Sequence, residues 1–170
     1  MRSIIFALLC VFLFSAPSPA QTEKGAGITM AADADAKDIV LPLYPGARRH
    51  KEKDSPGINF NLWGSGSGVK LAVLKMESDD SMDKIADYYK KQLSKYGKVL
   101  DCSYPDPHAH PSDKKDKDDD NKPLSCADDT PDKGGLLFKS GTKSDQHIVS
   151  IQPAPHGSLF QLVHVAHWDK

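Results

Sequence analysis

One hairpin-like segment in the middle of the chain limits the possible folds more than any other feature. In Ile58–Trp63, apolar residues alternate with Asn59 and Asn61, the period of two that a half-buried β-strand shows. Val69–Met76 is apolar on both alternating faces, which is typical of a strand in the centre of a sheet. Because the five-residue link at 64–68 consists of glycine and serine only, we predict that the two strands form a β-hairpin.

Residues Ser81–Tyr96 predict one amphipathic helix. Their apolar positions repeat every three or four residues, which places them on one stripe of an α-helix. Acidic residues at the start and lysines near the end complement the helix dipole, and Gly97 can end the helix. A single apolar stripe indicates one buried face, so we expect the helix to lie on a sheet. The stripe consists of Met82, Ile85, Ala86, Tyr89, Leu93 and Tyr96.

Further strand patterns follow the helix, and together they define the fold class. Hairpin-linked strands with a single helix are typical of the α+β class, and a chain of 170 residues has room for one core. We therefore expect a single α+β domain over residues 38–170, with an antiparallel sheet of about five to six strands and one amphipathic helix packed on one face. The later strands are predicted at Lys98–Cys102, Gly135–Ser140, Gln146–Gln152 and Ser158–Trp168.

The N-terminal sequence predicts export. Residues 1–20 resemble a secretory signal peptide: Arg2 supplies positive charge, Ile4–Phe14 is apolar, and small residues lead to Ala20. The apolar run is too short to cross a membrane, and a retained anchor or a buried helix is the alternative. Residues 21–37 are small and polar, and we expect a flexible leader there. The predicted location is secreted or periplasmic.

Loss of the signal peptide would remove Cys10 and leave two cysteines, Cys102 and Cys126. In an oxidising compartment such a pair forms a disulfide. Closing a loop of about 25 residues stabilises a fold by roughly 3–4 kcal/mol in the chain-entropy view. The alternative is two free thiols with a metal or redox role, but no C-x-x-C spacing supports it.

The polar segment at residues 103–133 holds the sequence candidates for metal binding. It has few apolar residues and recurring prolines, so we expect a disordered insertion. His108 and His110 can place two imidazoles on one side of an extended chain, an arrangement that suits zinc or copper. Asp116–Asn121 resembles half of a calcium loop, but it lacks the required glycine and the final glutamate. Metal binding by this insertion is therefore an alternative function. The other interpretation is that His108 and His110 are ordinary exposed residues.

The sequence matches the known enzyme motifs poorly. The link at 64–68 has glycine at the centre, where a nucleophile elbow needs serine, and Val69 stands where a dinucleotide loop needs glycine. His164 and His167 are three residues apart in a predicted strand, so they point to opposite faces. A hydrolase can still assemble Ser, His and Asp from distant positions, and it stays an alternative. We name no catalytic residue and expect no cofactor.

Three patterns in the first half of the chain occur together. They are Leu43–Ala47 (LYPGA), Asp80-Ser81 at the helix start, and Asp87–Lys90 (DYYK) followed by Leu93 and Gly97. This set resembles small exported bacterial proteins that have a YPGA turn and a helix of the form D-S-x-x-x-I-x-x-Y-Y-K. The resemblance covers residues 41–97. It implies a small exported α+β domain, and it implies no activity or ligand.

These observations favour an exported, non-catalytic domain that binds a protein or a small ligand in the periplasm or outside the cell. The formal net charge of −1 argues against nucleic-acid binding, and no membrane span is expected after signal removal. Strands 69–76 and 158–168 are apolar on both faces, so we expect the partner on the sheet face that the helix leaves open. The aromatic residues Tyr44, Trp63, Tyr104 and Trp168 either line such a surface or cover the core edges.

Overall fold

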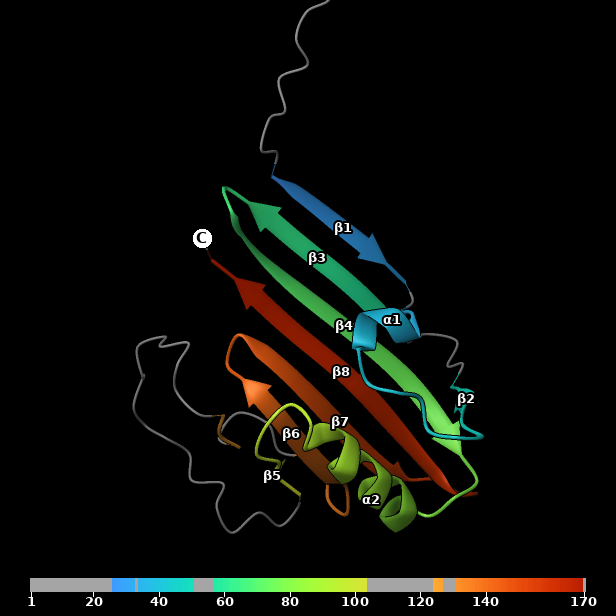
Figure 1. The fold of residues 1–170 in the computed structure, drawn as a ribbon. Coiled ribbons are helices and arrows are strands. Elements are labelled where there is room, and N and C mark those ends of the chain that lie inside the picture. The colour runs from blue at the N-terminus through green and yellow to red at the C-terminus, as the bar shows by residue number, and fades with distance from the viewer. Residues whose placement is uncertain (1–25, 33, 51–56, 104–123, 127–130, 170) are drawn as a thin grey trace, which may run out of the picture.

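The computed structural model describes residues 26–32, 34–50, 57–103, 124–126 and 131–169. They form an eight-stranded antiparallel sheet with two helices on one face (Figure 1). The strands are β1 (Gly27–Ala31), β2 (Arg48–Arg49), β3 (Ile58–Gly64), β4 (Ser67–Ser78), β5 (Leu100–Asp101), β6 (Leu136–Thr142), β7 (Asp145–Pro153) and β8 (Ser158–Trp168), and the helices are α1 (Ala36–Ile39) and α2 (Met82–Leu93). No helix in this part of the chain is long and apolar enough to span a membrane.

The strand order is β1-β3-β4-β8-β7-β6-β5, with β2 paired to one end of β4. This arrangement is compatible with the predicted α+β class, but the predicted five to six strands were too few, and the short helix α1 lies beside the one predicted helix. The additional strands are β1 and β2. β1 lies inside residues 21–37, where we expected a flexible leader, and it pairs with β3 along its whole length. Its residues are mostly exposed, so no burial pattern in the sequence marks it.

The predicted hairpin is present as β3–β4, and its connection is shorter than expected. The pairing runs from Ile58↔Val73 to Gly64↔Ser67, so only Ser65 and Gly66 form the turn. Both have positive φ, 51° and 96°, as two-residue hairpin turns of the I′ type require. β4 continues beyond this hairpin, and it pairs with β8 over eleven residue pairs.

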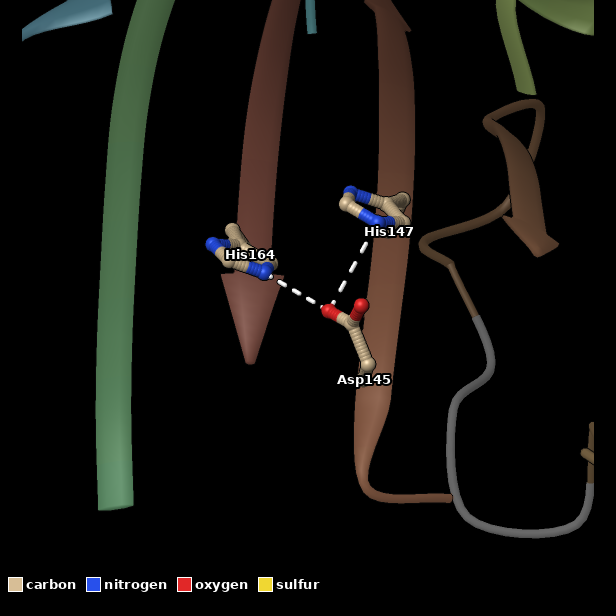
Figure 2. A group of neighbouring side chains, drawn as sticks. All are labelled: Asp145, His147 and His164. Atoms are coloured by element: carbon tan, nitrogen blue, oxygen red, sulfur yellow. Dashed lines mark hydrogen bonds and ion pairs between the residues drawn. The ribbon is translucent and has the colours of Figure 1, made fainter. Parts of the chain in front are cut away.

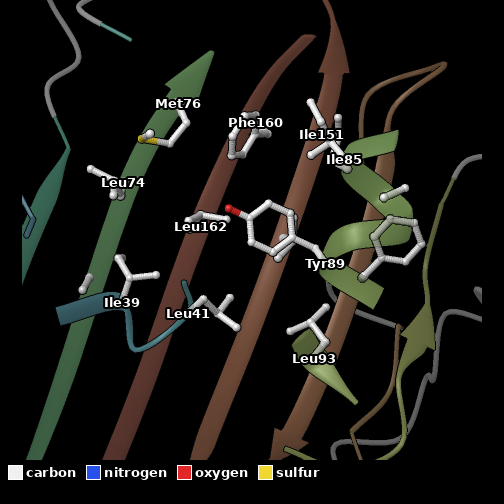
Figure 3. Close-up of a cluster of buried hydrophobic side chains, with 14 of the residues drawn as sticks. Ile39, Leu41, Leu74, Met76, Ile85, Tyr89, Leu93, Ile151, Phe160 and Leu162 are labelled. Atoms are coloured by element: carbon white, nitrogen blue, oxygen red, sulfur yellow. The ribbon is translucent and has the colours of Figure 1, made fainter. Parts of the chain in front are cut away.

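The hydrophobic core lies between the sheet and the two helices (Figure 3). The predicted stripe of α2 supplies buried residues, although the helix ends at Leu93 rather than at Tyr96. Tyr89 packs against Phe160 with ring centroids 5.7 Å apart. Burial of each large apolar side chain stabilises the fold by about 1.5–3 kcal/mol. The core includes Ile39, Leu41, Leu74, Met76, Ile85, Tyr89, Leu93, Ile151, Phe160 and Leu162.

The segment at 34–47 crosses the same face beside α2. Its Tyr44–Ala47 turn is closed by a hydrogen bond from Ala47 N to Tyr44 O (3.1 Å), as the YPGA pattern predicts. Three tyrosine hydroxyls connect the segment to α2 and to the residues just before and after it. Tyr44 donates to Asp80 Oδ2 (2.9 Å), while Tyr88 and Tyr96 donate to the carbonyls of Leu43 (3.2 Å) and Val40 (3.1 Å).

The predicted disulfide joins Cys102 to Cys126, with a Cα–Cα distance of 5.4 Å. It fixes residues 124–126 beside β5 and β6. Lys139, in β6, donates to the carbonyl of Ser125 (3.3 Å). Because the neighbouring Phe138 faces the core, Lys139 and Ser125 lie on the sheet face opposite the helices. Most of the predicted insertion at 103–133, with His108 and His110, lies outside the described residues.

Candidate functional site

The sheet has one face without helices, which we call the open face. On β4, Ala72, Leu74 and Met76 are buried under the helices, so the alternate residues of β4 point to the open face. The antiparallel register places the apolar residues of β3 beside them. The pairs on this face are Ile58↔Val73, Phe60↔Leu71 and Leu62↔Val69.

Over β1, β3 and β4 the open face is apolar, and none of the described residues covers it. In β1 the open-face side chains are Ile28 and Met30, which lie opposite Leu62 and Phe60. Exposed fractions are 64% for Ile28, 75% for Met30, 47% for Ile58, 41% for Leu62 and 39% for Val69. These fractions leave roughly several hundred Å² of contiguous apolar surface, the size at which exposed patches mark interaction sites.

A hollow of about 940 Å³ lies at the β3–β4 turn and adjoins the open face. Leu62 and Val69 belong to both the hollow and the face, so the two are continuous. Lys143 and Asp169 also line the hollow and bring charge to it. The hollow is open to solvent rather than enclosed, so it can receive a protruding side chain from another surface.

The tryptophans lie on the helix side of the sheet, not on the open face. Gly27, Trp63, Gly68 and Trp168 form one row across β1, β3, β4 and β8. The Trp63 ring lies over Gly27 and the Trp168 ring over Gly68, so closely that a Cβ atom at either glycine would overlap the ring. Glycine at these positions therefore makes room for the neighbouring indole.

The other aromatic candidates do not contribute to the open face either. Tyr44 packs against the core cluster, and Tyr104 lies outside the described residues. The interpretation that the aromatic residues cover the core edges therefore fits Tyr44. Trp63 also lines the hollow, so for Trp63 both interpretations stay open.

A second cluster lies on the helix side, and we call it the Asp–His cluster: Asp145, His147 and His164 (Figure 2). Asp145 and His147 are two residues apart in β7, so they share a face. The β7–β8 register places His164 directly opposite His147. One carboxylate oxygen, Asp145 Oδ1, lies 2.8 Å from His164 Nε2 and 3.6 Å from His147 Nε2. The imidazole rings are stacked, with centroids 4.8 Å apart.

Both histidines are buried, whereas Asp145 is exposed. Burial is the main cause that lowers the pKa of His147; His164 lowers it further, and Asp145 opposes the shift. His147 is therefore neutral near pH 7. Tyr96 covers this ring, with centroids 3.8 Å apart.

Ser140, His147 and Asp145 contain the residue types of a hydrolytic triad, but their burial argues against that chemistry. Ser140 pairs directly with His147 across β6 and β7. Its hydroxyl and His147 Nδ1 both lack a hydrogen-bond partner among the described residues. However, Ser140 is completely buried, so a substrate in solvent cannot reach its oxygen. This trio therefore gives the hydrolase alternative no support.

The sequence did not identify the Asp–His cluster, although it contains a signal for it. The pattern Asp145-Gln146-His147 places two ligand-type side chains on one face of a strand. We considered His164 only with His167, which lies on the opposite face of β8, as expected. The pairing of His164 with His147 depends on the register that the β7–β8 turn sets, and two isolated strands do not determine that register.

Comparison with known proteins gives no relative for this chain: no family model matches it, and neither a curated protein nor a solved structure shows significant similarity.

Proposed function

We propose that this protein is an exported, non-catalytic domain that binds a protein partner through the open face. The observation that carries the proposal is the contiguous apolar surface of β1, β3 and β4, on which five large apolar side chains are 39–75% exposed. Burial of apolar surface is the main favourable contribution to protein association. A partner that covers this surface therefore gains free energy from each of these side chains.

The shape and chemistry of the surface favour a protein over other partners. Small molecules bind mostly in concave sites that enclose them, whereas this surface is the face of a sheet with an open hollow at its end. The open-face residues of β1 and β3 are all uncharged, so phosphate groups find no cation on these two strands. The lysines of the surface, Lys75 on β4 and Lys143 in the hollow, lie beside them. β1 is also an edge strand, and an extended partner segment can pair with such an edge.

Export rests on the N-terminal sequence and is supported by the disulfide. Ile4–Phe14 and the small residues before Ala20 have the features of a cleaved signal. Cys102 and Cys126 are bonded, which is compatible with a periplasmic or extracellular location. The resemblance to small exported bacterial proteins over residues 41–97 also favours export.

The test is site-specific photo-crosslinking in the native host, followed by binding measurements with purified components. A photoreactive residue at position 62 probes the open face. The same residue at position 43 is a matched control, because Leu62 and Leu43 are 41% and 40% exposed and Leu43 lies beside α2, where its carbonyl accepts from Tyr88. We expect an adduct with another protein from position 62 and none from position 43. The purified partner should then bind the intact protein at least about tenfold more weakly after Leu62→Lys, and unchanged after Leu43→Lys.

Three results would overturn the proposal. Equal adducts from positions 62 and 43 would show that the open face has no special role. A self-adduct from position 62, with a dimer that Leu62→Lys dissociates, would make the face an interface between copies of this chain. A chain recovered from the cytosol with residues 1–20 still attached would contradict export.

A further inference from the structure

We propose that Asp145, His147 and His164 bind one divalent transition-metal ion of the zinc type. This inference is independent of the open face, because the cluster lies on the other side of the sheet. Two imidazole nitrogens and one carboxylate oxygen make up a common ligand set of catalytic and exchangeable zinc sites. Calcium and magnesium prefer sites composed of oxygen ligands, so a cluster dominated by imidazole selects against them.

The distances between the ligand atoms fit an ion held at their centre. Two ligands that each lie about 2.0–2.1 Å from a tetrahedral zinc ion are roughly 3.3 Å apart. The Asp145 Oδ1 to His164 Nε2 and Asp145 Oδ1 to His147 Nε2 distances are 2.8 and 3.6 Å, one on each side of that value. All three ligand atoms lie within 4.8 Å of one another. The two imidazole rings are stacked almost parallel, so both rings must turn about their side-chain bonds before their nitrogens point to one ion.

The hydrogen bonds of His164 prepare it as a ligand. Its Nδ1 lies 3.0 Å from the carbonyl oxygen of Asp38, and an oxygen acceptor there requires Nδ1 to carry a proton. Its Nε2 faces a second acceptor, Asp145 Oδ1. In the tautomer with the proton on Nδ1, Nε2 is the nitrogen whose lone pair can bind a metal ion, and the Asp145 carboxylate lies beside it. Orientation of a histidine by an Nδ1–H bond to a carbonyl is typical of metal sites.

The short helix α1 holds this carbonyl in place. Asp35 N donates to Asp38 Oδ2 (3.0 Å), and Asp38 N donates to Asp35 O (2.9 Å). Lys70, in β4, forms an ion pair with Asp38 at 3.3 Å. The carbonyl that orients His164 is therefore fixed from both the helix and the sheet.

Ser140 is the corresponding partner for His147. With metal on Nε2, the His147 Nδ1 atom carries the proton and needs an acceptor. Directly paired residues have Cβ atoms about 4.5–5.5 Å apart, so rotation of the Ser140 hydroxyl can bring its oxygen to Nδ1. This bond would satisfy both buried atoms that otherwise have no partner among the described residues. Asp145 is exposed, and it leaves the fourth coordination position on the solvent side for water.

The test is titration of the intact, disulfide-bonded protein with Zn²⁺ alone, after removal of bound metal by dialysis against a chelator. Calorimetry should give one ion per chain. Asp145→Asn keeps the size of the exposed side chain but removes its charge. It should weaken metal binding on the order of 100-fold, because mutating a residue that only orients a ligand already weakens binding by about 10–100-fold. Binding of Co²⁺ gives a second readout, because tetrahedral coordination by nitrogen and oxygen produces visible absorption without thiolate bands.

Two further variants separate this site from the insertion. His164→Gln removes a buried ligand, and His156→Gln is its control at an exposed histidine in the turn between β7 and β8. The double variant His108→Ala/His110→Ala removes the candidates of the insertion. Support requires that Asp145→Asn weakens binding at least tenfold while the double variant leaves it unchanged. Binding that survives Asp145→Asn, binding that the double variant abolishes, or no binding at millimolar Zn²⁺ would each overturn the proposal.

Discussion

Truncation of one leucine on each face of the sheet tests whether the open face is uncovered in the folded protein. Leu74 is 1% exposed and belongs to the core, whereas Leu62 is 41% exposed on the open face. Leu74→Ala removes a completely buried side chain and leaves a cavity, which costs about 2–5 kcal/mol. Leu62→Ala removes a side chain that is already largely in water, so its cost should be below about 1 kcal/mol.

Urea denaturation of the intact protein at pH 7 measures both values as shifts of the unfolding midpoint at constant slope. Leu43→Ala is the control for a leucine of equal exposure, 40%, on the helix side. We expect Leu62→Ala to resemble Leu43→Ala rather than Leu74→Ala. Equal losses of 2 kcal/mol or more, on the scale of a buried leucine, for Leu62→Ala and Leu74→Ala would refute the reasoning. Such a result would mean that another part of the chain, outside the described residues, buries the open face.

Other predictions concern the sheet edge, acid stability and the disulfide. Gly68→Val should lower the free energy of unfolding by about 1–3 kcal/mol through overlap with the Trp168 ring, and Gly68→Val/Trp168→Ala should recover part of the loss in thermal denaturation. Lys84 and then Tyr44 lower the pKa of Asp80. The stabilisation from Asp80 should therefore be present above the pKa of the unfolded state and be lost as the pH falls through the lower folded value. Tyr44→Phe should reduce this pH dependence in urea titrations between pH 7 and pH 3, and an unchanged dependence would contradict the assignment. Reduction of the disulfide, whose cysteines are 24 residues apart, should destabilise the fold by roughly 3–4 kcal/mol, and an unchanged unfolding midpoint in reductant would argue against that.

Elements with strong local periodicity were predictable from the sequence. The alternation of Ile58–Trp63 and the stripe of Ser81–Tyr96 are local signals, and the structure has a strand and a helix there. The Cys102–Cys126 bond followed from a count of cysteines rather than from geometry. The strand and the helix are each specified by a pattern within one segment, and each of the two cysteines has only one possible partner once Cys10 is removed.

Features that depend on long-range pairing were not predictable. β1 and β2 have little burial of their own, and they are strands because β3 and β4 provide pairing partners. The Asp–His cluster requires the register of β7 against β8 together with the carbonyl of Asp38, 126 residues away from His164. A shift of one residue in that register would move His164 away from His147, so no local pattern specifies the cluster.

The most direct test of the central claim is the solvent exposure of individual methyl groups in the intact free protein. NMR relaxation by a soluble paramagnetic agent measures it for each methyl. If the open face is an uncovered apolar binding surface, the methyls of Met30 and Leu62 should relax as strongly as those of Leu43, while those of Leu74 stay protected. Protection of Met30 and Leu62 to the level of Leu74 would contradict the claim.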